Sequence, residues 1–183
     1  MPITCIVTAV PGPCKCAPPR WAIVKAGGEW VVCRAFDIEP GREERTVPYI
    51  HRIRVRYGEC DQQGVVFNPN YMVYMDDASE NWVSSLTPSG NFLELGWDWM
   101  VVRSTIEWQA PAHHGETLSI DVAILRYGST SFEIGFIGKV GERAVFKARS
   151  VCVSVKVSTT EKFATPDHVK ALLGPAVEWD VPA

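Results

Sequence analysis

Two features of this sequence have residue types and a spacing that could do chemistry: one carboxylate and one helix start. Asp61 stands in a polar stretch bounded by Gly58 and Gly64, and the pair Asn68-Pro69 begins seven residues after it. A carboxylate in such a loop can attack a carbonyl carbon, activate water, or accept a hydrogen bond from its own backbone in an Asx-turn. The residues alone therefore leave both a catalytic and a turn-forming interpretation of Asp61 open.

The second chemical feature is the backbone amide of Asn68. Pro69 lacks an N–H and suits the first position of a helix, and an asparagine before it is a good N-cap. The Asn68 side chain is expected to cap amides inside the first turn, which leaves the Asn68 N–H free at the positive end of the helix dipole. An amide in this position favours an oxyanion.

Two predicted elements flank Asp61. From Ile50 onward, apolar and basic residues alternate as in a half-buried strand, with Ile53, Val55 and Tyr57 on one side and Arg52, Arg54 and Arg56 on the other. After Pro69, apolar residues recur every three or four positions until Pro88 and Gly90, as on one face of a helix: Tyr71, Met75, Ala78, Trp82 and Leu86.

The rest of the sequence predicts a sheet. Four extended runs separated by turn sequences read as an antiparallel meander, at about 97–109, 116–127, 130–140 and 143–157. A short helix is expected over 168–173. Because the order lacks βαβ alternation, we predict an α+β domain in which one helix packs on one face of an antiparallel sheet.

Composition suggests one domain with an extension. The 183 residues are 46% hydrophobic and 21% charged, which suits one compact core. Seven prolines interrupt residues 1–48, so we predict an N-terminal extension over 1–48, a domain over 49–175 and a tail over 176–183. Within the extension, Gly27-Gly28 indicates either a hairpin between about 21 and 33 or a loosely ordered segment.

Charge and cysteine content narrow the class of protein. A net charge of −3 gives no basic field, so neither nucleic acid nor a membrane is an expected partner. No apolar run reaches the length of a membrane helix and no secretory leader is recognisable, so a cytoplasmic location is expected. The pair Cys14 and Cys16 has no second half at zinc spacing, and neither a disulfide framework, a metal nor another cofactor is predicted.

Residues 57–78 resemble the signature of the 4-hydroxybenzoyl-CoA thioesterase family, which includes the YbgC-like acyl-CoA thioesterases. The match combines Asp61 after the first strand, Gly64 three residues later, the aromatic Tyr71 and the acid Asp76. The similarity continues through 102–104, 108–115 and 128–132, so it covers roughly 49–157 and leaves the extension outside.

The resemblance implies a hotdog fold, in which a long antiparallel sheet wraps around a central helix. It also implies a homodimer or homotetramer with the active site at a protomer interface, and metal-free hydrolysis of acyl-CoA or aryl-CoA thioesters. Asp61 is then the catalytic nucleophile or general base, two roles that the sequence does not separate. The Asn68 backbone N–H polarises the carbonyl, although better-known relatives carry tyrosine or histidine at this position.

The same resemblance suggests a set of substrate-binding residues, each with a simpler alternative. Tyr57 is a pocket or core aromatic, Asp76 an acyl-pocket or solvated acid, and Arg126 a CoA contact or a solvated strand end. The full expected set is Tyr57, Gly64, Tyr71, Asp76, Arg126, Thr130 and Ser131.

Other reactive side chains and functions are less favoured. His113 and His114 fall in a turn without an acidic partner at ligand spacing, and Cys60 has no activating histidine, so a surface turn and a small buried residue are expected. A hotdog dehydratase or hydratase would need a histidine near the helix, which residues 57–86 lack. A non-catalytic acyl-CoA-binding protein is the remaining alternative.

Overall fold

The structure, a computed structural model, describes residues 21–26, 29–34 and 48–183. These residues fall into two units, divided between Arg45 and Thr46. In the first unit, β1 (Trp21–Ala26) pairs with β2 (Glu29–Arg34) in an antiparallel hairpin. Of the two alternatives for this segment, the hairpin is the one observed. The predicted turn glycines and the Cys14 and Cys16 pair lie outside the described residues.

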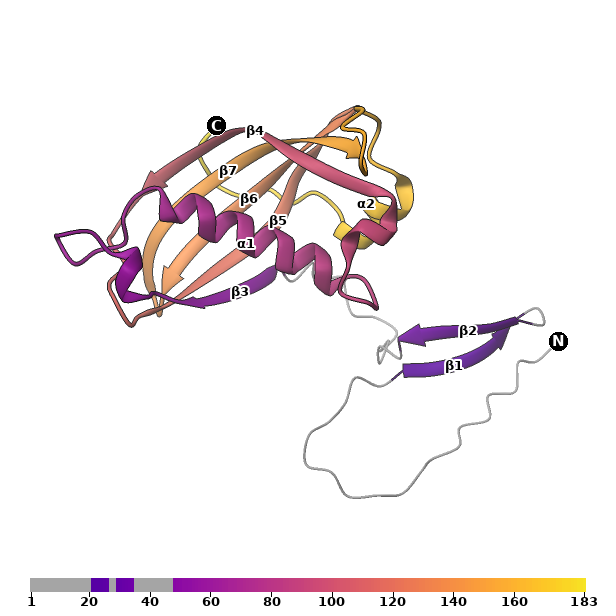
Figure 1. The fold of residues 1–183 in the computed structure, drawn as a ribbon, viewed down its shortest axis with the longest axis horizontal. Coiled ribbons are helices and arrows are strands. Elements are labelled where there is room, and N and C mark those ends of the chain that lie inside the picture. Colours follow the sequence, from indigo (N-terminus) through magenta and orange to yellow (C-terminus); the bar gives the residue numbers. More distant parts are fainter. Residues whose placement is uncertain (1–20, 27–28, 35–47) are drawn as a thin grey trace, which may run out of the picture. The chain divides into compact units, whose positions relative to one another are not determined.

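The second unit is built on a five-stranded antiparallel sheet (Figure 1). Its spatial order is β3-β5-β6-β7-β4, so β3 and β4 are the edge strands. The strands are β3 (Tyr49–Arg54), β4 (Trp97–Trp108), β5 (Thr117–Tyr127), β6 (Ser131–Val140) and β7 (Arg143–Lys156). The bounds of β4 to β7 lie within about two residues of the four predicted runs. The expected α+β hotdog architecture is confirmed.

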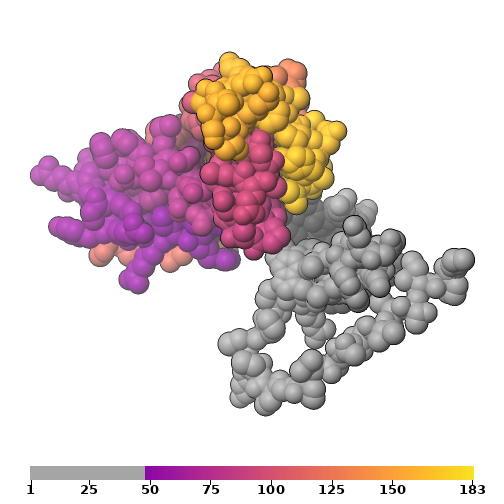
Figure 2. All heavy atoms as spheres, turned by 45° about the vertical axis from the view of Figure 1, so that its right-hand side comes forward, coloured from indigo at the N-terminus to yellow at the C-terminus, as the bar shows by residue number. Residues whose placement is uncertain are grey.

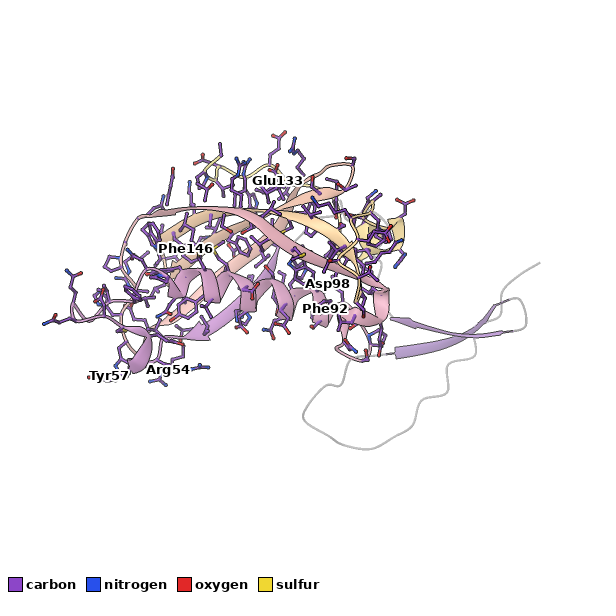
Figure 3. All side chains as sticks on the ribbon, turned by 45° about the horizontal axis from the view of Figure 1, so that its top comes forward. Arg54, Tyr57, Phe92, Asp98, Glu133 and Phe146 are labelled. Carbon is purple, nitrogen blue, oxygen red and sulfur yellow. The ribbon has the colours of Figure 1, made fainter. Side chains whose placement is uncertain are left out.

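The long helix α1 (Asn70–Ser85) runs along one face of this sheet (Figure 1). Its buried residues recur at the predicted spacing, because one side of the helix faces the sheet while the other faces solvent. They are Tyr71, Tyr74, Met75, Ala78, Ser79, Trp82 and Val83. The opposing core side chains include Leu118, Ile120, Phe132, Phe136 and Phe146. In Figure 3 the Phe146 ring lies between α1 and the sheet.

Two local expectations were wrong. The first strand ends at Arg54, and Tyr57 belongs instead to a 3-10 turn, η1 (Tyr57–Glu59), with its side chain 82% exposed. Val55 still exchanges backbone hydrogen bonds with Glu116 and Gly115, just before β5, and the chain then turns into η1. The helix begins at Asn70 with Pro69 as its N-cap, and no side chain caps it.

The C-terminal residues complete the second unit. The helices η2 (Phe92–Leu95) and α2 (Asp167–Leu173) lie side by side through a contact between His168 and Leu95. After α2 the chain passes behind the sheet (Figure 1), and in Figure 2 the yellow C-terminal atoms lie next to the orange ones on one side of this unit. Val177 donates to the carbonyl of Ile124 on β5 at 2.8 Å, beyond the end of β3. No helix in the described part of the chain has both the length and the apolar character needed to span a bilayer.

Candidate active site

Asp61 stands in a tight, hydrogen-bonded turn between η1 and α1. Its backbone N–H donates to the carbonyl of Val65 at 2.8 Å, and its carbonyl accepts from Gly64 at 3.0 Å. Gly64 has φ +78°, a left-handed conformation that glycine adopts without strain. On the far side of the turn, Val65 pairs with His113, which joins the turn to the segment before β5.

The Asp61 carboxylate forms the turn that was one of the two interpretations left open by the sequence. Oδ1 accepts from the backbone N–H of Gln63 at 2.8 Å, the geometry of an Asx-turn. Within residues 48–183 no hydrogen bond involves Oδ2, and the residue is partly exposed. The turn therefore fixes the direction of the carboxylate while one oxygen remains available for chemistry.

Glu59 ties this turn to α1. Its Oε2 accepts from the backbone N–H of Arg56 at 2.7 Å and from the hydroxyl of Tyr74 at 2.8 Å. Its backbone carbonyl accepts from the Phe67 N–H at 2.9 Å and from the Asn70 side-chain amide at 2.8 Å. Burial, followed by this bond to Glu59, raises the pKa of the Tyr74 hydroxyl. The sequence analysis missed the hydrogen bonds that join Glu59 to α1, although Glu59 lies only two residues before Asp61.

The Asn68 backbone amide lies at the start of α1. The amides of Asn70, Tyr71 and Met72 donate to the carbonyls of Phe67, Asn68 and Pro69, so the first turn is closed by backbone alone. These carbonyls replace the predicted side-chain cap. In the described part of the chain the Asn68 N–H makes no hydrogen bond, and the residue is exposed. It is a free donor at a helix N-terminus.

Two hollows follow one another along the seam between α1 and β4. The first, of about 290 Å³, is here called the Asn68 hollow. Its lining includes Val65, Val66, Asn68, Tyr71 and Trp108.

The second hollow, of about 310 Å³, is here called the inner pocket. It is lined from α1 by Met72, Val73, Met75, Asp76 and Ser79, and from the sheet by Trp99, Val101, Ser104, Ile134, Phe136, Ser150 and Cys152. Of these residues, the sequence analysis names only Asp76 as a candidate for an acyl pocket.

Tyr71 closes the inside of the Asn68 hollow. It is buried, and its hydroxyl accepts from the Ala112 N–H at 3.3 Å. Its ring contacts Trp108 and Phe146 edge-on, with centroid distances of 6.3 and 5.3 Å. Burial raises the pKa of its hydroxyl. Tyr71 therefore holds the segment after β4 against α1.

The remaining predicted residues lie apart from Asp61. Tyr57 meets His114 edge-on at 5.8 Å and points away from the core (Figure 3). Arg126, Thr130 and Ser131 lie at the turn between β5 and β6, whereas Asp61 is joined to the segment before the start of β5. At about 3.3 Å per residue, the length of β5 separates these regions by roughly 33 Å. One protomer does not bring them together.

Other titratable groups form no metal centre. Among residues 48–183 no three His, Cys, Asp or Glu side chains converge as a metal site would require. Cys60 is partly buried, and burial raises the pKa of the Cys152 thiol to about 12. His51 contacts Asp77 at 2.7 Å, a pair that sequence reasoning missed, but neither residue lines the two hollows.

The sequence of the second unit matches a known family. Residues 55–173, more than half of the chain, match the model of the thioesterase-like superfamily, and the protein belongs to that superfamily.

Individual relatives agree with this assignment. The chain is 30% identical to the Bacillus subtilis protein named "Putative acyl-CoA thioesterase YneP", over 55% of this chain and 76% of the relative. Among solved structures, a thioesterase-superfamily protein from Jannaschia is similar with a TM-score of 0.66 and 21% identity, covering 78% of this chain and 99% of that one. A 1,4-dihydroxy-2-naphthoyl-CoA thioesterase from Synechocystis gives 0.59 and 21%, covering 68% and 94%.

Proposed function

We propose that this protein hydrolyses acyl-CoA or aryl-CoA thioesters to the free acid and CoA, as a member of the 4-hydroxybenzoyl-CoA thioesterase branch of its superfamily. One observation carries the proposal. Asp61 and the free Asn68 N–H belong to one hydrogen-bonded loop, which Glu59 ties to α1. The Asn68 hollow beside this loop offers space for a thioester.

In the proposed reaction, the thioester oxygen accepts a hydrogen bond from the Asn68 N–H, where the helix dipole favours negative charge. The Asp61 carboxylate either attacks the carbonyl carbon or removes a proton from an attacking water. Collapse of the tetrahedral intermediate breaks the C–S bond and releases the CoA thiolate, which takes up a proton. In the nucleophilic route, water then hydrolyses the mixed anhydride and restores Asp61.

The proposal includes a homodimer at least, through the free edge of β4. This edge exposes three consecutive apolar side chains, Met100, Val101 and Val102, at 51, 48 and 60%. A row of unpaired strand amides and carbonyls with apolar side chains is prone to pair with a second chain.

Antiparallel pairing of β4 with its copy would also join the two halves of the site. Such pairing about a two-fold axis places the Asp61 end of one protomer beside the Arg126 end of the other. Arg126, Thr130 and Ser131 of the second copy then become candidates for contact with the CoA arm.

The alternatives predict different results. A hotdog dehydratase would require a histidine at the thioester, and neither hollow has a histidine in its lining. A non-catalytic binding protein would bind acyl-CoA without releasing CoA.

The test is release of free thiol from a panel of aliphatic and aromatic acyl-CoAs, followed with a thiol reagent. Turnover above the uncatalysed rate supports the thioesterase. Binding by calorimetry without thiol release favours the non-catalytic protein and contradicts the proposal.

A further inference from the structure

The inner pocket contains a polar feature that core packing does not require. Ser104 on β4 and Ser150 on β7 stand directly opposite each other in the sheet, with their hydroxyl oxygens 2.8 Å apart. Ser150 is only 4% exposed, and both residues line the pocket. Around them the lining is mostly apolar, including Trp99, Ile134 and Phe136.

The pocket exists because inward-facing side chains on β7 become small. Phe146 fills its place under α1, but the next inward positions are Ala148, Ser150 and Cys152, all buried. Ser104 faces this row from β4. Small residues on neighbouring strands leave the space of about 310 Å³, at the lower end of the range for small-molecule sites.

In the described part of the chain, one of the two O–H groups of the serine pair has no acceptor. Each hydroxyl has one O–H to donate, and the single bond between Ser104 and Ser150 uses only one of the two. Within residues 48–183 neither hydroxyl has another hydrogen-bond partner. A buried donor in apolar surroundings costs free energy unless an acceptor reaches it.

The pocket lies at the right distance for the acyl part of a thioester. Its first α1 residue, Met72, follows Asn68 by four positions, about one helical turn or ~6 Å. A carbonyl polarised by the Asn68 N–H would therefore place an acyl group, a few atoms further on, at the pocket entrance. At the ~30 Å³ that one water molecule occupies in the liquid, the pocket has the volume of roughly ten waters, which is room for an acyl chain of medium length.

We propose that the inner pocket binds the acyl group, and that the Ser104 and Ser150 pair selects acyl groups carrying a neutral oxygen acceptor, a hydroxyl or a ketone, several atoms from the thioester carbonyl. The inference rests on the proposed thioesterase function and assigns its specificity. Asp76 also lines the pocket, so a terminal carboxylate on the acyl group is disfavoured by like-charge repulsion.

The experiment compares matched substrates and serine variants. Octanoyl-CoA and 7-hydroxyoctanoyl-CoA differ only in the distal hydroxyl. Their kcat/KM ratio is measured for wild type, the double variant Ser104→Ala with Ser150→Ala, and the control Ser119→Ala, whose serine is on β5 outside the pocket. The double variant is needed because either serine alone would still present one free O–H to the substrate. We expect a preference of roughly 3- to 10-fold for the hydroxylated substrate, lost in the double variant and kept in the control.

A binding measurement separates this proposal from the catalytic one. Dissociation constants of both acyl-CoAs are measured by calorimetry on Asp61→Asn protein, with and without the double change Ser104→Ala and Ser150→Ala. If wild type hydrolyses no acyl-CoA but the hydroxyl preference in binding depends on the serine pair, the thioesterase function fails and the pocket assignment stands. Equal affinities, or a preference that the double variant retains, would overturn the pocket assignment.

Discussion

The two ends of the sheet carry different parts of the proposed site and hold them in different ways. At one end, backbone bonds to Val65 and Gly64 and the tie from Glu59 to Tyr74 fix the Asp61 turn. At the other end, Arg126 reaches into solvent with its side chain 70% exposed.

There, Arg126 pairs at 2.7 Å with Glu133, a buried carboxylate on the sheet face opposite α1 that also pairs with Arg149 at 3.2 Å (Figure 3). The Arg126 side of this pair is exposed, and an exposed side chain is held only weakly by an ion pair. The contrast suggests that the first end supplies fixed catalytic geometry, whereas the second supplies an adaptable contact for a charged arm of the substrate.

Asp61→Asn should produce the largest effect, because it removes the chemistry from the fixed end without disturbing its structure. Asparagine keeps the Oδ1 acceptor of the Asx-turn, so the free energy of unfolding should change by about 1 kcal/mol or less. It can neither attack as a carboxylate nor accept a proton near neutral pH. We expect kcat on the best acyl-CoA to fall at least about a hundredfold.

Asp76→Asn is the matched control for Asp61→Asn, since Asp76 lines the inner pocket and should lose less activity. Melting temperature and oligomeric state are measured for both variants. Retention by Asp61→Asn of more than about a tenth of wild-type kcat, a barrier change under about 1.4 kcal/mol, would show that Asp61 is not the catalytic carboxylate.

Val102→Lys tests whether the Asp61 end of one protomer meets the Arg126 end of its partner across a dimer. Val102 is the extra residue at a bulge in β4, is 60% exposed and does not line the inner pocket. A lysine there should oppose pairing of two β4 edges, giving a monomer with activity reduced roughly tenfold or more.

The control for the edge variant is Ile50→Lys, on the opposite edge strand β3, which should leave assembly and activity intact. Light scattering and thiol release are measured on the same samples. A wild-type protein that is monomeric at micromolar concentration and fully active would contradict the shared-site dimer.

Arg126→Gln should act on substrate binding alone. If Arg126 contacts the CoA arm at the adaptable end, its loss should raise KM several-fold while kcat stays nearly constant, the pattern of an interaction made equally in ground and transition states. Steady-state kinetics at two salt concentrations provides the measurement, because an ionic contact weakens with salt. An unchanged KM at low salt would identify Arg126 as only the partner of Glu133.

Tyr74→Phe should loosen the Asp61 end of the sheet, because it removes one hydrogen bond to Glu59. We expect a loss of about 0.5–1.5 kcal/mol in stability and a fall of a few-fold in kcat, with KM less affected. Tyr49→Phe is the matched control, since no hydrogen bond within residues 48–183 involves the Tyr49 hydroxyl. Equal kcat values for the two variants would show that the tie stabilises the fold without positioning Asp61.

The sequence predicted elements better than it predicted the contacts between them. Alternation and glycine turns located the long strands, and the spacing from Tyr71 to Trp82 located α1, because both patterns are local. The Tyr57 prediction failed because the end of β3 depends on where its partner strand β5 begins, at Thr117, far along the chain.

Apart from Asp76, the lining of the inner pocket was not predicted from the sequence, for a similar reason. Its lining comes from α1 and from three strands, and Ser104 and Ser150 are 46 residues apart. Only the row of small residues at 148, 150 and 152 hinted at it. Asp61 and Asn68, in contrast, lie on one short loop, so their proximity could be predicted from their spacing in the sequence.

Deletion of residues 1–46 should have the smallest effect. The unit from Thr46 to Ala183 contains the sheet, α1 and the proposed site residues, and its core is made of residues from Val55 onward. Because the described lining residues of both hollows belong to this unit, the truncated protein should fold with a melting temperature within a few degrees of the full chain and keep kcat/KM within about twofold. Circular dichroism, light scattering and thiol release test this on both proteins. A truncated protein that is folded and dimeric but inactive would show that the N-terminal unit contributes to the site. The site would then include that unit as well as the two ends of the sheet.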